Sequence, residues 1–228
     1  MSKHILYPPV TIPFMMLFLI LLMLFTFLIF IDVIGVAFRK LGFSPKIIAF
    51  LLVASLIGSI INIPIHRIRT EIPVINLGFI EFFGVRYPTP YIEEQALETI
   101  VAVNVGGALI PILVSVYLIM VDIAILPSIT LATVITTIVI HGVARPVRGL
   151  GIAIPTLIPP IVAVLAAFIT GGGSPVVAYI SGTLGTLIGA DLLNIDKIPK
   201  LRAPVVSIGG AGTFDGIFLT GIIAALLT

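Results

Sequence analysis

The chain contains no cysteine, and only 10% of its 228 residues are charged. The absence of cysteine excludes disulfides, thiol nucleophiles and thiolate metal sites. Soluble domains carry about 25% charged residues, so the shortage of charge argues against a water-soluble protein. With 59% hydrophobic residues and a mean hydropathy of +1.30, the composition predicts a membrane protein that crosses the bilayer several times.

Motifs of several enzyme classes are also missing. His4, His66 and His141 do not form the His-Glu-x-x-His pattern of zinc proteases. No Gly-x-Ser-Gly with a membrane histidine is present, and every lysine lies near a loop or a terminus, which excludes a Ser-Lys dyad. The Lys and Arg residues are scattered over short connections, which argues against nucleic-acid binding. We therefore expect no metal, no cofactor and no nucleic-acid partner.

Apolar stretches of about 20 residues fill most of the chain, and each is long enough to cross the hydrocarbon as a helix. The breaks between them predict an all-α, polytopic membrane protein with one membrane domain, 1–228. The first stretch is too long for a signal peptide and is expected to remain as an anchor. The expected transmembrane helices are 12–36, 46–64, 97–120, 126–142, 155–171, 175–195 and 209–227.

Positive residues predict the orientation of these seven spans. The N-terminus and every second connection share one side of the membrane, and that side holds nine positive residues against three on the other. The positive-inside rule therefore places the N-terminus in the cytoplasm and the C-terminus outside the cell membrane. The nine are Lys3, Arg67, Arg69, Arg86, Arg145, Arg148, Lys197, Lys200 and Arg202, and the three are Arg39, Lys40 and Lys46.

The connection 66–96 is the only sizeable one between the expected spans. Its run from Ile72 to Phe83 is too apolar for a solvated linker. The pattern predicts an interfacial loop that lies on or dips into the membrane. A passive hairpin and a gate or substrate-docking strand both fit this prediction.

Two aspartates, Asp191 and Asp215, lie well inside apolar segments. A carboxylate in hydrocarbon costs about 2.5 to 3.5 kcal/mol, so intramembrane acids are typical of functional sites. Asp191 lies six residues before Lys197, and Asp215 lies six residues after Gly209. At about 1.5 Å per residue, each lies roughly 9 Å inside its helix end. Because a short loop joins the two helices, the hairpin 175–227 is expected to bring the carboxyl groups together.

Small residues strengthen this expectation, since they permit close approach of helices in lipid. Two neighbouring carboxyl groups cannot both ionise cheaply, so one stays protonated. The ionised group can then take a proton from water as it attacks a peptide carbonyl, while its partner hydrogen-bonds the oxyanion. The small residues are Gly182, Gly185 and Gly189 on the first helix and Gly209, Gly210, Gly212, Gly216 and Gly221 on the second.

The segment from Gly182 to Leu227 resembles the catalytic helix pair of the GxGD intramembrane aspartyl proteases, the group of presenilin, signal peptide peptidase and prepilin peptidases. Phe214-Asp215 is similar to their aromatic-aspartate motif, and Gly189-Ala190-Asp191 is similar to their Gly-x-Gly-Asp motif, in the reverse of the usual order. If the usual order is kept, the same two aspartates pair. Ala203-Pro204 takes the place of the Pro-Ala-Leu element. The whole chain also looks like an archaeal and bacterial membrane protein family of unknown function.

The resemblance implies an aspartic endopeptidase without metal or cofactor. Its partners would be the lipid bilayer and a membrane-embedded polypeptide, a transmembrane or signal-type helix cut near the cytoplasmic leaflet. It implies catalytic roles for Asp191 and Asp215, and substrate contacts for Gly189, Phe214, Gly216, Ala203 and Pro204.

Two other interpretations stay open from the residues. The aspartates can be helix-packing residues hydrogen-bonded to a neighbour such as Thr186 or Asn194. They can also serve a proton- or cation-coupled transporter, for which Asn104-Val105-Gly106-Gly107 with Pro111 would mark a broken helix. The oligomeric state is open, a homo-oligomer included.

Overall fold

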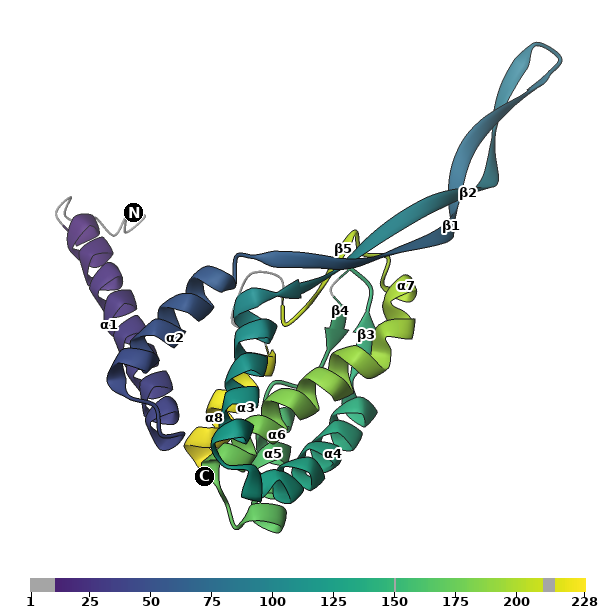
Figure 1. Ribbon diagram of the computed structural model, residues 1–228. Helices are drawn as coiled ribbons and strands as arrows, with labels where there is room; N and C mark the ends of the chain where they lie inside the picture. Colours follow the sequence, from purple (N-terminus) through teal and green to yellow (C-terminus); the bar gives the residue numbers. More distant parts are fainter. Residues whose placement is uncertain (1–10, 150, 211–215) are drawn as a thin grey trace, which may run out of the picture.

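The computed structural model describes residues 11–149, 151–210 and 216–228, which form a group of apolar helices and a long β-hairpin (Figure 1). The helices are α1 (Thr11–Lys40), α2 (Pro45–Gly58), α3 (Ile110–Val121), α4 (Leu126–Val143), α5 (Ile158–Gly171), α6 (Pro175–Thr186), α7 (Ile198–Leu201) and α8 (Gly216–Leu227). The strands are β1 (Asn62–Phe82), β2 (Val85–Asn104), β3 (Arg145–Val147), β4 (Gly151–Ala153) and β5 (Val205–Ile208). Two π-helical segments, η1 (Val105–Leu109) and η3 (Leu187–Asp191), and two 3₁₀ segments, η2 (Ile123–Ile125) and η4 (Leu192–Lys197), interrupt or extend the helices.

Helix α6 is the central helix and packs against α4, α5 and α8. Nine of its twelve residues are buried, and many of them are small, which allows neighbouring backbones to come close. Tyr179 of α6 and Phe218 of α8 are among the largest fully buried side chains of the core. This dense packing places the residues that follow α6 inside the protein.

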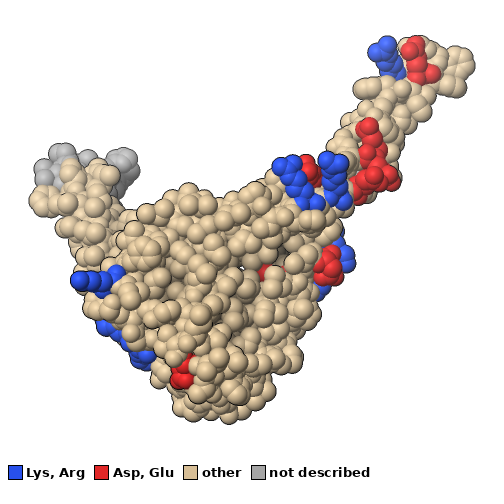
Figure 2. All heavy atoms as spheres, in the orientation of Figure 1, with Lys and Arg blue, Asp and Glu red and all other residues tan. Residues whose placement is uncertain are grey.

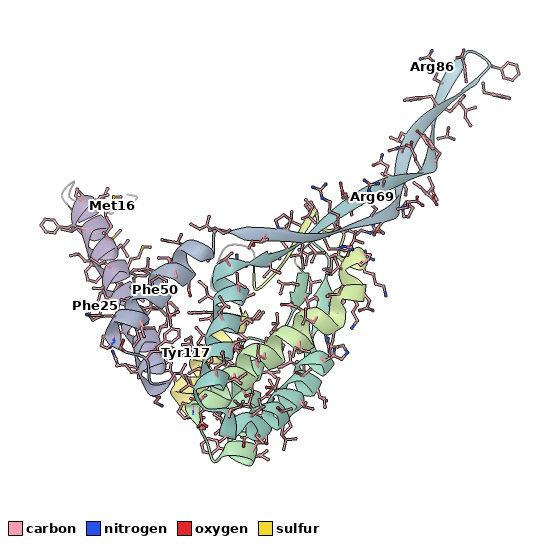
Figure 3. The ribbon with its side chains drawn as sticks, viewed as in Figure 1. Met16, Phe25, Phe50, Arg69, Arg86 and Tyr117 are labelled. Carbon is pink, nitrogen blue, oxygen red and sulfur yellow. The ribbon has the colours of Figure 1, made fainter. Side chains whose placement is uncertain are left out.

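Helix α1 extends away from this core (Figure 1). Met16 and Phe25, which Figure 3 labels on α1, are 60% and 62% exposed. Phe50 of α2 and Tyr117 of α3 line an apolar groove on the same side of the molecule. Such an extensive apolar exterior fits contact with lipid rather than water.

Strands β1 and β2 form a two-stranded antiparallel arm that leaves the body of the protein (Figure 1). Their register runs from Asn62 opposite Asn104 to Phe82 opposite Val85. Phe83 and Gly84 turn the chain with φ angles of 52° and 75°, the positive values that a tight hairpin turn requires. At the base of the arm, β5 pairs in parallel with residues 100–103 of β2. Twenty residues at roughly 3.3 Å each give an arm of about 65 Å.

The prediction of an all-α protein with seven transmembrane helices is wrong. The fold is mixed α/β, with a three-stranded sheet β1-β2-β5 and the small sheet β3-β4. In the described residues, three helical stretches are long and apolar enough to span a membrane, Ile12–Lys40, Ile123–Val143 and Pro175–Leu201. The shorter apolar helices are Pro45–Gly58, Val105–Val121, Ile158–Gly171 and Gly216–Leu227. The chain remains, on this basis, a membrane-associated protein.

The error has a physical cause at the arm. The expected helix 46–64 ends in a strand, because β1 begins at Asn62, and the expected helix 97–120 begins in one, because β2 continues to Asn104. Hydropathy records that residues are apolar, and it does not separate helix from strand. The connection 66–96 forms most of the paired arm, and its position relative to a bilayer stays a prediction.

Candidate functional site

Asp191 lies at the end of η3, within the long helical stretch Pro175–Leu201, and is half-buried. Asp215 and Phe214 lie outside the described residues. Asp191 and the described neighbours of both aspartates define the candidate site.

The helix that carries Asp191 changes its winding at this point, from α in α6 to π in η3 and to 3₁₀ in η4. Such changes disturb the regular ladder of backbone hydrogen bonds and occur often at functional sites. The side-chain amide of Asn194, which is fully buried, donates to the carbonyl oxygens of Ala190 at 2.8 Å and Gly189 at 3.0 Å. Asn194 thus satisfies the backbone carbonyls directly before Asp191.

His141 of α4 and Lys197 complete this polar cluster. The Nδ1 atom of His141 lies 3.3 Å from the Gly189 carbonyl oxygen and 3.4 Å from Nδ2 of Asn194. Both amide hydrogens of Asn194 point to backbone carbonyls, so we assign the proton to Nδ1 of His141, which then donates to Gly189. The Lys197 ammonium donates to Oδ1 of Asn194 at 2.5 Å. Asn194 and His141 thus contact the backbone directly before Asp191, and Lys197 supports Asn194.

The close packing of η3 against α4 requires glycine at position 189. A Cβ atom at this position would lie 2.6 Å from the backbone oxygen of Thr137 and 3.1 Å from Cβ of Ile140. Only glycine permits that approach, which brings His141 within reach of the carbonyl of Gly189. Its expected contact with a substrate stays a prediction.

Ala203 and Pro204 join β5 to the base of the arm. The hydroxyl of Thr99 donates to the carbonyl of Ala203 at 2.8 Å, and the backbone N–H of Ile100 donates to the carbonyl of Pro204 at 3.0 Å. Ala203 is buried, whereas Pro204 is exposed. A substrate role for this pair likewise stays a prediction.

The helices next to the two aspartates are close together and antiparallel. A Cβ on Gly182 of α6 would lie 3.1 Å from the methyl of Thr220 on α8, and one on Gly221 would lie 2.9 Å from the ring of Tyr179. Nearer the aspartates, Leu187 and Ile217 share one buried cluster. The close pairing expected from the glycine pattern is therefore present between α6 and α8.

Described residues beside both aspartates also meet at one apolar cluster. Ala190, next to Asp191, is buried in a cluster against which Ile154 packs. A Cβ atom on Gly216, next to Asp215, would lie 3.6 Å from the Cδ1 atom of the same Ile154. Gly216 thus lies near a side chain that packs against the buried cluster containing Ala190.

The helix break expected near Asn104 forms a second polar junction. Asn104 is fully buried, and its Nδ2 donates to the carbonyl of Ser59 at 2.7 Å and to Oδ1 of Asn62 at 3.1 Å. Its Oδ1 accepts from the backbone N–H of Gly107 at 2.7 Å and caps η1. These internal bonds join α2, the arm and α3, and they occupy the polar groups that an ion would need.

Sequence reasoning considered His141 and Asn194 separately and did not identify Lys197 as part of the cluster. The signal was the spacing of Asn194 and Lys197, three residues apart and so on one side of a helix. Contact with His141 depends on the packing of α4 against η3, which the sequence does not state. Within the described ranges, no group of three or more His, Asp or Glu residues is arranged to hold a metal ion.

Comparison with known proteins gives a family without a described activity. Neither the curated proteins nor the solved structures contain a match to this chain. A family model matches residues 56–227, a range that covers the arm, the central helices and the polar cluster around Asp191. The chain therefore belongs to the family described as protein of unknown function (DUF1614).

Proposed function

We propose that this protein is an intramembrane aspartyl protease-like hydrolase that cleaves transmembrane or signal-type helices with Asp191 and Asp215. The observation that carries the proposal is that Gly216, the chain neighbour of Asp215, lies near Ile154, which packs against the buried cluster containing Ala190, the chain neighbour of Asp191. The antiparallel packing of α6 against α8 supports it. Both features favour two acids that act together.

The surroundings of Asp191 suit a carboxyl group that must be held still while it exchanges protons. Asn194, His141 and Lys197 fix the backbone and the helix end around it. Its partial exposure leaves a route for water, and the apolar residues on the neighbouring helices lower the local dielectric. A preorganised, partly dry carboxyl site is what general acid–base catalysis requires.

In this proposal the two carboxyl groups share one proton. The ionised aspartate takes a proton from the attacking water, and the protonated aspartate donates a hydrogen bond to the oxygen of the scissile carbonyl. The roles are then exchanged as the amine leaves with a proton. The titration belongs to the pair, so neither aspartate is assigned a fixed role.

We further propose that the base of the arm faces the cytoplasm, with the N-terminus on the same side and the C-terminus outside. The Lys40 ammonium at the end of α1 donates to the carbonyl of Leu226 at the end of α8, at 2.7 Å. These two helix ends therefore share one side of the molecule. Arg145, Lys200 and Arg202 belong to elements near the arm, at the other end (Figure 1). The excess of positive residues there supports the cytoplasmic assignment.

The test uses the full chain reconstituted in liposomes with a single-span helix tagged at both ends. We expect wild-type protein to release both tagged fragments, and Asp191→Asn and Asp215→Asn to release neither while they retain wild-type folding. Asp196→Asn is the matched control, because Asp196 lies on the same helical stretch and is exposed. Wild-type cleavage by either of the first two variants would refute the proposal.

The transporter alternative gives a different result in the same liposomes. A pH-sensitive dye inside the vesicles would report proton uptake that depends on Asp191 and proceeds without any cleavage. Since the polar groups of Asn104 are occupied by internal hydrogen bonds, the helix break gives this alternative little support. Proton uptake of this kind would replace the hydrolase proposal.

A further inference from the structure

A polar pocket of about 390 Å³ lies where the arm meets the body of the protein. It is formed by β1 of the arm, by the β3–β4 connection and by α7 with the residue that follows it. The polar residues that line it are Thr70, Glu71, Arg148, Lys200 and Arg202, with Pro146 and Pro199 among its walls. Figure 2 shows charged residues along the arm and at its junction with the body, and further charged residues on the opposite side of the body near α1.

The pocket has an excess of positive charge. Three cations and one carboxylate line it, so the formal charge is 3 − 1 = +2. Two of the three arginines on the arm are paired, Arg67 with Glu98 at 3.6 Å and Arg86 with Glu81 at 3.8 Å. In the described part of the chain, Arg148, Lys200 and Arg202 make no such ion pair. Three cations that share one pocket with a single carboxylate, and form no ion pair with it, are suited to an anion supplied from outside.

The backbone holds these cations in place. The N–H of Gly149, next to Arg148, donates to the carbonyl of Leu201 at 2.8 Å, which joins the β3–β4 connection to α7. Leu201 is fully buried, so this contact is anchored in the core. Arg202 then takes a left-handed conformation with φ 51° and ψ 34°, which is unfavourable for a residue with a side chain. Strained conformations of this kind occur at ligand sites.

The pocket also lies at one end of a candidate membrane span. The candidate span Pro175–Leu201 ends at α7, and Lys200 and Arg202 stand at that end. The end of a transmembrane helix is where the bilayer presents its phosphate groups, and basic pockets at this level bind anionic head groups.

We propose that this pocket binds a phosphate group, with Arg148, Lys200 and Arg202 as its cationic ligands and the hydroxyl of Thr70 as a further donor. The phosphate can belong to an anionic lipid head group or to a soluble phosphate compound, since both offer the same oxygens and charge. The proposal does not depend on the aspartates or on hydrolysis.

The experiment uses the full chain in neutral detergent micelles. Native mass spectrometry measures retention of dioleoyl phosphatidic acid against dioleoylglycerol, which differs by the phosphate group alone, and calorimetry measures binding of inorganic phosphate. We expect selective retention of phosphatidic acid for a lipid source, or binding of inorganic phosphate for a soluble source. These comparisons on wild-type protein need no variant.

The double variant Arg148→Gln/Arg202→Gln identifies the site. Both side chains are exposed, so we expect an unchanged unfolding midpoint and at least a tenfold loss of affinity. Lys46→Gln/Arg86→Gln removes the same charge at exposed positions outside the pocket and should change the affinity less than twofold. Equal losses in the two double variants, or no preference for phosphatidic acid together with no binding of inorganic phosphate, would overturn the proposal.

Discussion

Replacement of Gly185 by alanine tests the helix contact on which the candidate site depends. Gly185 of α6 faces α4, and an ideal Cβ at this position would lie 2.6 Å from Cβ and 2.7 Å from Cγ2 of Thr136. Thr136 is fully buried, and its hydroxyl donates to the carbonyl of Ala132 at 2.9 Å, so its side chain has no free space to enter. The added methyl group must therefore push the two helices apart.

The size of the effect follows from this geometry. Carbon atoms pack at about 3.5 to 4.0 Å, so α4 and α6 would have to separate by roughly 1 Å. Overpacking of this kind costs about 1 to 3 kcal/mol. The higher helix propensity of alanine offsets about 0.5 to 1 kcal/mol of this overpacking cost. We expect a net loss of about 1 to 2 kcal/mol in the free energy of unfolding, which lowers the midpoint by roughly 2 to 8 °C.

Gly142→Ala is the matched control, because Gly142 lies in α4 and no atom is within 4 Å of its ideal Cβ. That change should leave the midpoint unchanged or raise it by roughly 1 to 3 °C. Thermal unfolding of both variants in the same detergent, followed by far-UV circular dichroism, measures the difference. Equal midpoints for Gly185→Ala and Gly142→Ala would show that α4 and α6 do not pack as described.

Two further predictions use the same unfolding measurement. Asn194→Leu removes both hydrogen bonds to the carbonyls of Gly189 and Ala190. Because buried carbonyls are then left without donors, the variant should lose about 2 to 4 kcal/mol of unfolding free energy. A wild-type unfolding midpoint would contradict the role given to the amide. Arg202→Gly relieves a left-handed backbone and should raise stability by about 0.5 to 1 kcal/mol while it weakens phosphate binding. If Arg202→Gly instead lowered the midpoint, the arginine would be needed for folding and the assigned strain would be wrong.

The sequence predicted the region around Asp191 better than the rest of the chain. Glycine at 182, 185 and 189 indicated close helix packing, and the structure places α8 and α4 against these positions. The packing prediction succeeded because small residues at regular spacing in an apolar helix mainly serve close helix–helix contact in lipid. The pairing of Asp191 with Asp215 stays a prediction, since Asp215 lies outside the described residues.

The connection 66–96 was expected as an interfacial loop that a hairpin or a strand would fit, but the extent of the paired arm, which reaches into the expected helices 46–64 and 97–120, was missed. Residues 72–83 are apolar on both faces of the hairpin, so no alternation with polar residues marks them as a strand. The signals that were present are Pro64, Pro73, Pro88 and Pro90, which disfavour a helix interior, and the Phe83-Gly84 turn. Pairing over 20 positions depends on contacts between residues far apart in the chain, which a local pattern cannot supply.

The two π segments show how irregular backbone is accommodated in this apolar protein. In a low-dielectric interior every freed N–H or C=O group needs a partner, and water is scarce. An asparagine meets this need at both places. Asn104 accepts from the N–H of Gly107 in η1, and Asn194 donates to the carbonyls of Gly189 and Ala190 in η3.

The surroundings of these two asparagines distinguish their roles. Asn104 is enclosed by Ser59, Asn62 and Gly107, so its hydrogen bonds end within the protein and hold α2, the arm and α3 together. Asn194 instead supports the turn that presents the half-buried Asp191. Irregular backbone that only joins elements can be fully enclosed, whereas irregular backbone that serves chemistry must also present a reactive group. Under the proposed function, η3 rather than η1 is the segment that presents a reactive group.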